Sequence, residues 1–213
     1  MGKQEKKEIG LSSKLFTAYI AGITLLLFMA PSSADLLVYD RGQIAAGQVW
    51  RLFTGSFVHF SPSHLLFNLI VFVVAGWTIA SRGYPGFRMF CTLSAGLIGL
   101  ASYVLTPDMV QYGGLSGIAC GAVVYLALHG LSEKGLWRNI CTVTLLLTAC
   151  KILVEYRLGH FLFVSSSDGT FVPAPLSHAV GSLTAVMVFL LGGVLKDPFW
   201  AQIKEEKNES NGI

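Results

Sequence analysis

Charged residues are scarce in this sequence, because Asp, Glu, Lys and Arg make up only 13% of its 213 residues. A soluble globular domain carries about 25% of these residue types. Apolar residues account for 53% of the chain, and the mean hydropathy is +0.62. The shortage of charge therefore excludes an ordinary soluble domain and indicates a membrane protein that lies in the lipid bilayer.

Cysteine is also rare, and the four cysteines all lie inside apolar runs, at Cys91, Cys120, Cys141 and Cys150. A cysteine in such a setting behaves as a small hydrophobic residue, so the sequence predicts neither a disulfide framework nor a metal site. The net charge of +3 is explained by basic cytoplasmic loops and requires no nucleic acid. We expect no metal, no organic cofactor and no nucleic-acid partner.

The apolar residues gather in six runs, compared with the roughly 17–25 residues that a membrane-spanning helix needs. The runs are about Leu11–Ala30, Ser63–Ala80, Phe87–Leu105, Leu115–Leu131, Ile140–Tyr156 and Ala174–Leu195. The sequence therefore predicts an all-α membrane protein, a six-transmembrane-helix bundle over residues 11–195. A short segment, 1–10, precedes the bundle, and a polar tail, 196–213, follows it.

The basic residues predict the orientation of the bundle. With the N-terminus in the cytoplasm, the inner segments hold 11 of the 15 Lys and Arg residues. Basic residues concentrate in cytoplasmic loops, so both termini are predicted to be cytoplasmic. The stretch "KLFTAYIAGITLLLFMAPSSAD" also has the basic start, apolar middle and small-residue end of a signal peptide. We favour an uncleaved first helix because five further runs follow.

Three polar clusters stand at the outer ends of apolar runs. His64 and Asn68 open the second run, Ser116 opens the fourth, and His178 opens the sixth. These runs cross in the same direction, so the clusters reach a similar depth below the outer surface. Strongly polar groups at membrane depth are costly and usually face the interior of the bundle. The three clusters therefore predict one shared site.

Ser116 and His178 are the residue types of a nucleophile and its base, because a serine hydroxyl needs a base and a neutral histidine is the usual one. Small residues spaced four apart would bring the fourth and sixth helices into contact. These are Gly117 and Gly121 on one helix and Gly181 and Ala185 on the other.

His64 and Asn68 lie four residues apart and share one helix face. With the backbone N–H of Ser116, they could donate hydrogen bonds to an oxyanion. Gly113 and Gly114 allow a tight entry into the fourth helix.

No carboxylate is expected to orient His178, so the sequence favours a Ser–His dyad over a triad. Asp108 and Asp168 lie in loops, and Glu155 lies at the far end of the fifth run. Lys151 and Glu155 are expected to pair with each other, and the alternative is a role in gripping a substrate tail.

The order and spacing of these motifs resemble those of the rhomboid family of intramembrane serine proteases. The matching elements are the six-helix plan, "WR" in the first loop, "HFSPSHLLFN", "GLSG" and "HAVG", and the match covers roughly Trp50 to Leu195. The resemblance implies that Ser116 is the nucleophile and His178 the general base.

The resemblance also implies roles for residues around this pair. His64, Asn68, Gly114 and Leu115 would form the oxyanion or substrate-binding site. Trp50 and Arg51 would belong to a structural motif of the first loop, and His59 would be a structural histidine. Deacylation needs water, so we expect a cavity open to the outside and a mobile lid around "SSSDGT", which contains Gly169.

A narrower resemblance is to the rhombosortase branch, carried by "KILVEYRLG", "FVPAPLSHAVG" and the compact length. It implies exported bacterial substrates with C-terminal Gly-Gly sorting tails, and a place in the bacterial inner membrane. The branch often has an acidic residue near the last histidine, where this chain has "PAPLSH". The alternatives are a rhomboid protease of other single-span substrates, a silent helix-binding relative, and a transporter with a histidine relay, which would predict an inverted repeat.

Overall fold

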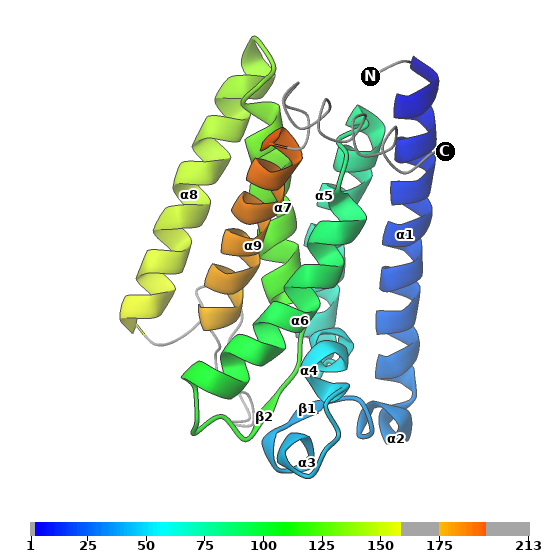
Figure 1. The fold of residues 1–213 in the computed structure, drawn as a ribbon, viewed down its shortest axis with the longest axis vertical. Helices are drawn as coiled ribbons and strands as arrows, with labels where there is room; N and C mark the ends of the chain where they lie inside the picture. The colour runs from blue at the N-terminus through cyan, green and yellow to red at the C-terminus, as the bar shows by residue number, and fades with distance from the viewer. Residues whose placement is uncertain (1–2, 159–174, 195–213) are drawn as a thin grey trace, which may run out of the picture.

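The computed structural model of the chain describes residues 3–158 and 175–194, and six long helices lie side by side in it (Figure 1). They are α1 (Lys3–Met29), α5 (Pro62–Arg82), α6 (Phe87–Leu105), α7 (Ser116–Gly130), α8 (Leu136–Leu158) and α9 (Pro175–Val194). Short elements lie at one end of the bundle: α2 (Pro31–Ala34), β1 (Tyr39–Asp40), α3 (Arg41–Ala45), α4 (Arg51–Thr54), the 3-10 turn η1 (Gly55–Phe57) and β2 (Gln111–Tyr112).

Five of the described helices are long and apolar enough to cross a membrane: α1, α5, α6, α8 and α9. The sixth, α7, is apolar but has only 15 residues. At 1.5 Å per residue it is about 22 Å long, whereas the hydrocarbon core is about 30 Å thick. The sequence predicts that this run spans the membrane as a helix. In the structure, α7 is too short to do so, and the irregular segment before it completes the crossing.

That irregular segment is buried, as backbone at membrane depth must be. Gly113, Gly114 and Leu115 are all buried among the surrounding helices. The chain therefore becomes helical only at Ser116, below the end of the bundle where the short elements lie. The short length of α7 thus places its first residue in the interior.

Local signals explain the two ends of α5. The Ser61 side chain accepts a hydrogen bond from the backbone N–H of His64, and Pro62 occupies the first turn, where it is well tolerated. The helix ends at Gly83, which adopts a left-handed conformation with φ 66°. The N-terminal cap holds His64 in the first turn, facing the interior, where it is buried.

The short elements form a structural platform around Arg51. This side chain is buried and donates hydrogen bonds to the carbonyls of Asp35 and Val38. Trp50 is half exposed and donates from Nε1 to the Leu36 carbonyl at 3.2 Å. The platform continues into the pairing of β1 with β2, which precedes Ser116.

Helices α7 and α9 approach each other through glycines. An added Cβ on Gly181 would lie 2.0 Å from the Gly117 carbonyl oxygen, and one on Gly121 would lie 2.4 Å from the Gly181 carbonyl oxygen. Ala185 is fully buried one turn further along α9. The backbones can approach this closely only because these positions carry no side chain.

Replacing Gly181 by alanine is expected to destabilise the protein by about 1–3 kcal/mol, because the new methyl group overpacks the α7–α9 contact. It should also lower activity, because the helices must separate three residues from His178. Gly192→Ala is the matched control, since within the described residues no atom outside its own stretch of α9 lies within 4 Å of that added Cβ. Thermal unfolding in detergent measures both variants, and equal midpoints would contradict the expectation.

An ion pair fastens the opposite end of the bundle. Arg82, at the end of α5, contacts Glu133 at 2.6 Å between α7 and α8, and its guanidinium lies 3.7 Å from the ring centre of Trp137. Both charged side chains are about one-third exposed. The pair therefore joins helix ends far from the buried polar clusters.

Candidate active site

A pocket of about 410 Å³ opens between α5, α7, α8 and α9. The residues that line it are His64, Phe67, Asn68, Val71, Ser116, Cys120, Val123, Thr148, Lys151, Glu155 and His178. Four predicted site residues, Ser116, His178, His64 and Asn68, therefore share one cavity although they come from three separate helices.

The turn before α7 positions Ser116. Gly114 has φ +141°, and an added Cβ would lie 2.6 Å from Cε1 of His64, so only glycine fits here without strain. Leu115 is fully buried and Ser116 is half-buried at the pocket wall. The serine thus reaches the cavity from a tightly packed turn.

Tyr112, on β2, contributes a second hydroxyl beside this turn. It donates to the Gly114 carbonyl at 3.1 Å. Burial raises the pKa of Tyr112 to about 12, and the hydroxyls of Ser177 and Ser116 oppose that rise. The side chain is therefore a neutral phenol at working pH, and it links the first turns of α7 and α9.

His59 connects the α7 turn to Asn68. Its Nε2 lies 3.2 Å from the Leu115 backbone nitrogen and 3.0 Å from the Asn68 amide Nδ2. A backbone N–H can only donate, so Nε2 is the acceptor and the ring proton is on Nδ1. The ring also packs on His64, with centroids 5.0 Å apart. His59 therefore orients Asn68 without lining the pocket.

The titration of His59 should make the protein less stable in acid. Burial, with a smaller effect of the His64 charge, lowers the pKa of His59 from 6.5 to about 3. Between these values the unfolded chain binds a proton that the folded chain does not, so stability falls as pH falls. We expect His59 to contribute a loss of about 2 kcal/mol from pH 7 to pH 5.

His59→Gln tests this expectation, because glutamine retains an acceptor oxygen and does not titrate. The unfolding midpoint of this variant should depend less steeply on pH than that of the natural protein. An identical pH dependence in both proteins would show that His59 is not the titrating group.

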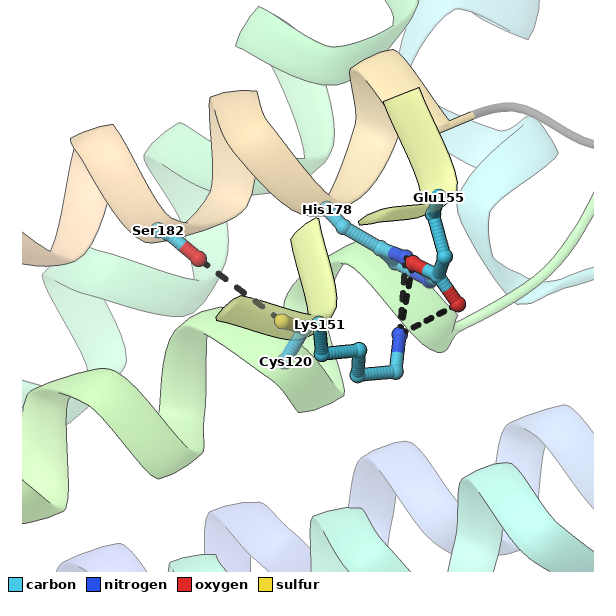
Figure 2. A network of polar contacts seen from close by, with 5 residues as sticks. All are labelled: Cys120, Lys151, Glu155, His178 and Ser182. Atoms are coloured by element: carbon cyan, nitrogen blue, oxygen red, sulfur yellow. Dashed lines mark hydrogen bonds and ion pairs between the residues drawn. The ribbon is translucent and has the colours of Figure 1, made fainter. Parts of the chain in front are cut away.

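The expectation that no carboxylate orients His178 is wrong. Figure 2 shows Glu155 of α8 beside the imidazole, with Oε2 2.7 Å from Nδ1. Both Glu155 oxygens also lie 2.7 Å from Nζ of Lys151, so the predicted Lys–Glu pair is present as well. Helix α9 follows α8 in the chain, so the last turns of α8 and the first turns of α9 lie at the same end of the bundle. Glu155 and His178 therefore lie at the same depth.

Cys120 and Tyr112 are among the residues of the site that the sequence did not predict. Cys120 lies one turn after Ser116, lines the pocket and contacts the Ser182 hydroxyl with its sulfur at 3.7 Å (Figure 2). Tyr112 lies outside the apolar runs. The spacing of four from Ser116 could have identified Cys120, but no pattern in the sequence marks Tyr112. The predicted lid around Gly169 lies outside the described residues.

The site combines a serine hydroxyl and an imidazole with amide donors, in a pocket whose walls are largely apolar. Asn68 contributes its side-chain amide from α5, and Ser116 contributes a backbone N–H at the start of α7. The first N–H groups of a helix have no partner within the helix, so they are suited to binding an anion. These are the groups needed for acyl transfer to a serine.

The family comparison and the comparison with individual proteins agree with each other. Residues 46–195, more than half of the chain, match the family model of the Rhomboid domain. The Rhomboid protease GlpG of Enterobacter sp. (strain 638) is 32% identical over 115 residues, and that of Salmonella newport (strain SL254) is 36% identical over 84 residues. These matches cover 52% and 39% of this chain, and 41% and 30% of the two relatives, so the chain matches less than half the length of each.

Proposed function

The chain belongs to the rhomboid family, and from this premise we propose that it is an intramembrane serine endopeptidase with Ser116 as nucleophile and His178 as general base. One observation carries the assignment of residues. Ser116 from α7 and His178 from α9 line the same pocket, together with His64 and Asn68 from α5. Placing a serine and a histidine together at membrane depth costs free energy, so such a pair usually marks a functional site.

The reaction begins when Nε2 of His178 takes the hydroxyl proton of Ser116 and Oγ attacks the carbonyl carbon of the substrate. The carbonyl bond opens to an oxyanion. As that bond re-forms, the C–N bond breaks, and the imidazolium gives its proton to the departing nitrogen. Water then gives a proton to His178 and attacks the carbonyl carbon of the acyl ester. As the bond from that carbon to Oγ breaks, the imidazolium returns the proton to Oγ, which releases the second product and restores Ser116.

The oxyanion is stabilised by donors that are already in place before the reaction. The Asn68 amide, the His64 ring and the backbone N–H of Ser116 are the groups assigned to it. His59 and Gly114 support this assignment, because His59 holds the Asn68 amide and Gly114 leaves room for the His64 ring. Such donors act only when charge develops on the carbonyl oxygen.

The protein is an integral multi-pass membrane protein, and we place both termini in the cytoplasm of a bacterial cell, with the bundle in the inner membrane. The distribution of Lys and Arg supports this orientation. In this orientation the platform around Arg51 faces outward, and the pocket lies just below the outer surface. Cleavage would then release a domain on the outer side.

The substrates are membrane-anchored proteins with one spanning helix, and we propose those with C-terminal Gly-Gly sorting tails. The motifs "KILVEYRLG" and "FVPAPLSHAVG" support the rhombosortase assignment. Phe67, Val71 and Val123 also line the pocket, so part of its wall is an apolar surface for a substrate segment.

The test uses detergent-solubilised protein and a panel of single-span substrates, half of them ending in a Gly-Gly tail with basic residues. Mass spectrometry identifies the cut sites, and a serine-reactive phosphonate reports the nucleophile. We expect a phosphonate adduct on Ser116 and cleavage of the tailed substrates only. Ser116→Ala is the control for contaminating proteases.

The outcomes test the protease function and the rhombosortase assignment separately. Cleavage of ordinary spanning helices as well would retain the protease and reject the rhombosortase assignment. No cleavage and no adduct on Ser116 would reject the protease and favour a silent helix-binding relative.

A further inference from the structure

We propose that Glu155 is a positioning residue of the catalytic assembly, holding His178 through Nδ1, and that Lys151 holds Glu155 in turn. This inference rests on the proposed protease function and extends the Ser–His pair to a chain of four side chains. The contacts that carry it are 2.7 Å from Oε2 of Glu155 to Nδ1 of His178, and 2.7 Å from each Glu155 oxygen to Nζ of Lys151 (Figure 2).

The distances determine where the protons lie. Lys151 contacts both oxygens of Glu155, as an ammonium does with an ionised carboxylate. An ionised carboxylate can only accept, so the short contact to His178 requires a proton on Nδ1. Nζ of Lys151 lies 3.2 Å from Nδ1 because both nitrogens donate to the same oxygen, Oε2. The neutral ring is therefore unprotonated at Nε2, as a base for Ser116 requires.

Lys151 makes a buried carboxylate tolerable at this depth. The Glu155 side chain is only 1% exposed, and a lone charge there would cost several kcal/mol. The two residues are four apart on α8, so the pair can form within one helix and is neutral overall. The lysine side chain is 25% exposed and lines the pocket.

The Arg82–Glu133 pair is a structural ion pair of this chain, with which the Lys151–Glu155 pair can be compared. It joins the end of α5 to the turn between α7 and α8, both side chains are about one-third exposed, and neither residue lines the pocket. Lys151 and Glu155, by contrast, lie on one helix, so their pairing joins no two elements. The shorter of the contacts that cross from α8 to His178 of α9 is the one made by Glu155, at 2.7 Å, and Lys151 follows at 3.2 Å. The position of Glu155 is therefore explained by its contact with His178.

During proton transfer the two charges act on the imidazolium in opposite directions. Glu155 favours the positive ring and Lys151 opposes it. Removing the carboxylate alone therefore leaves the ring facing an unpaired cation, which is worse than removing both charges. A purely structural pair would also be relieved by the second substitution, but that relief would appear in thermal unfolding. A positioning role is distinguished because the relief appears in kcat and in the rate of labelling at Ser116.

The experiment compares Glu155→Gln, Lys151→Met and the double variant with the natural protein. Each is assayed for kcat and KM on a cleaved single-span substrate, for the rate of phosphonate labelling at Ser116, and for thermal unfolding. We expect Glu155→Gln to lower kcat and labelling by on the order of 10²–10⁴-fold with KM little changed. The double variant should recover about 10-fold of that loss, the scale of one partly screened charge.

Glu133→Gln is the matched control, because it removes a glutamate from the Arg82 pair. It should lower the unfolding midpoint and leave kcat within about threefold, the usual range for a distant site. If Glu155→Gln does not fold, Glu155→Asp replaces it and should lower kcat without changing KM, because its carboxylate is one methylene short of Nδ1.

The experiment distinguishes failure of the proposed protease function from failure of the role of Glu155. A natural protein that neither cleaves nor labels at Ser116 would overturn the proposed function itself. A natural protein that labels, beside a folded Glu155→Gln variant that labels equally fast, would overturn the role of Glu155 alone. A double variant no faster than Glu155→Gln would also reject the role assigned to Lys151.

Discussion

Ser116→Ala and His178→Ala are each expected to lower kcat/KM by about 10⁴-fold or more, and the double variant should be no worse than either one. The physical reason is that the two side chains perform one proton transfer. Without the hydroxyl, the base has no proton to take. Without the imidazole, the hydroxyl is too weak a nucleophile. The measurement is cleavage of a single-span substrate by protein reconstituted in vesicles.

Ser182→Ala is the matched control for this experiment. Ser182 lies on α9 one turn after His178, and its hydroxyl contacts the sulfur of Cys120, but it does not line the pocket. Its activity should stay within a few-fold of the natural protein. Losses that add in the double variant would show that Ser116 and His178 act independently, which would contradict the proposed base.

Asn68→Ala is expected to lower kcat by about 10²–10³-fold with little change in KM. The amide is assigned to the oxyanion, which exists only as the carbonyl is attacked, so its loss affects the transition state more than substrate binding. His59 would keep its second hydrogen bond, to the Leu115 backbone, so the α7 turn should remain in place. Steady-state kinetics with the same substrate separates kcat from KM.

Thr78→Val serves as the control on the same helix. Its hydroxyl bonds only to the Val74 carbonyl in the contacts described for it, and it is distant from the pocket lining. Unchanged kinetics in this variant would show that α5 tolerates substitution. A loss in Asn68→Ala that appears only in KM would reject the oxyanion role and favour substrate contact.

The apolar runs predicted the helices well, because helix length in a membrane follows from the thickness of the hydrocarbon layer. The run Phe87–Leu105 has the bounds of α6, and the run Ser63–Ala80 differs from α5 by one residue at its start and two at its end. Polar residues at the ends account for the difference. Ser61 caps α5 from outside the apolar run, and Arg82 continues the helix to Gly83.

The fourth run shows where counting apolar residues is insufficient. Leu115–Leu131 appears long enough to span, but α7 has 15 residues and its entry is irregular buried backbone. Composition cannot reveal this, because buried irregular backbone and a buried helix are equally apolar. The close contact between Gly114 and the His64 ring needs the neighbouring helix to be in place.

The class of the protein, its helices and the depth of the polar residues along them follow from the sequence, because a helix rises by a constant amount per residue. Tertiary structure alone decided which side chains meet at that depth. Glu155 was known to lie near one end of its helix, but its contact with His178 depends on which face of α8 packs against α9. That rotation is settled by packing between helices, through contacts such as Gly130 of α7 with Cys141 of α8, and one helix cannot specify it alone.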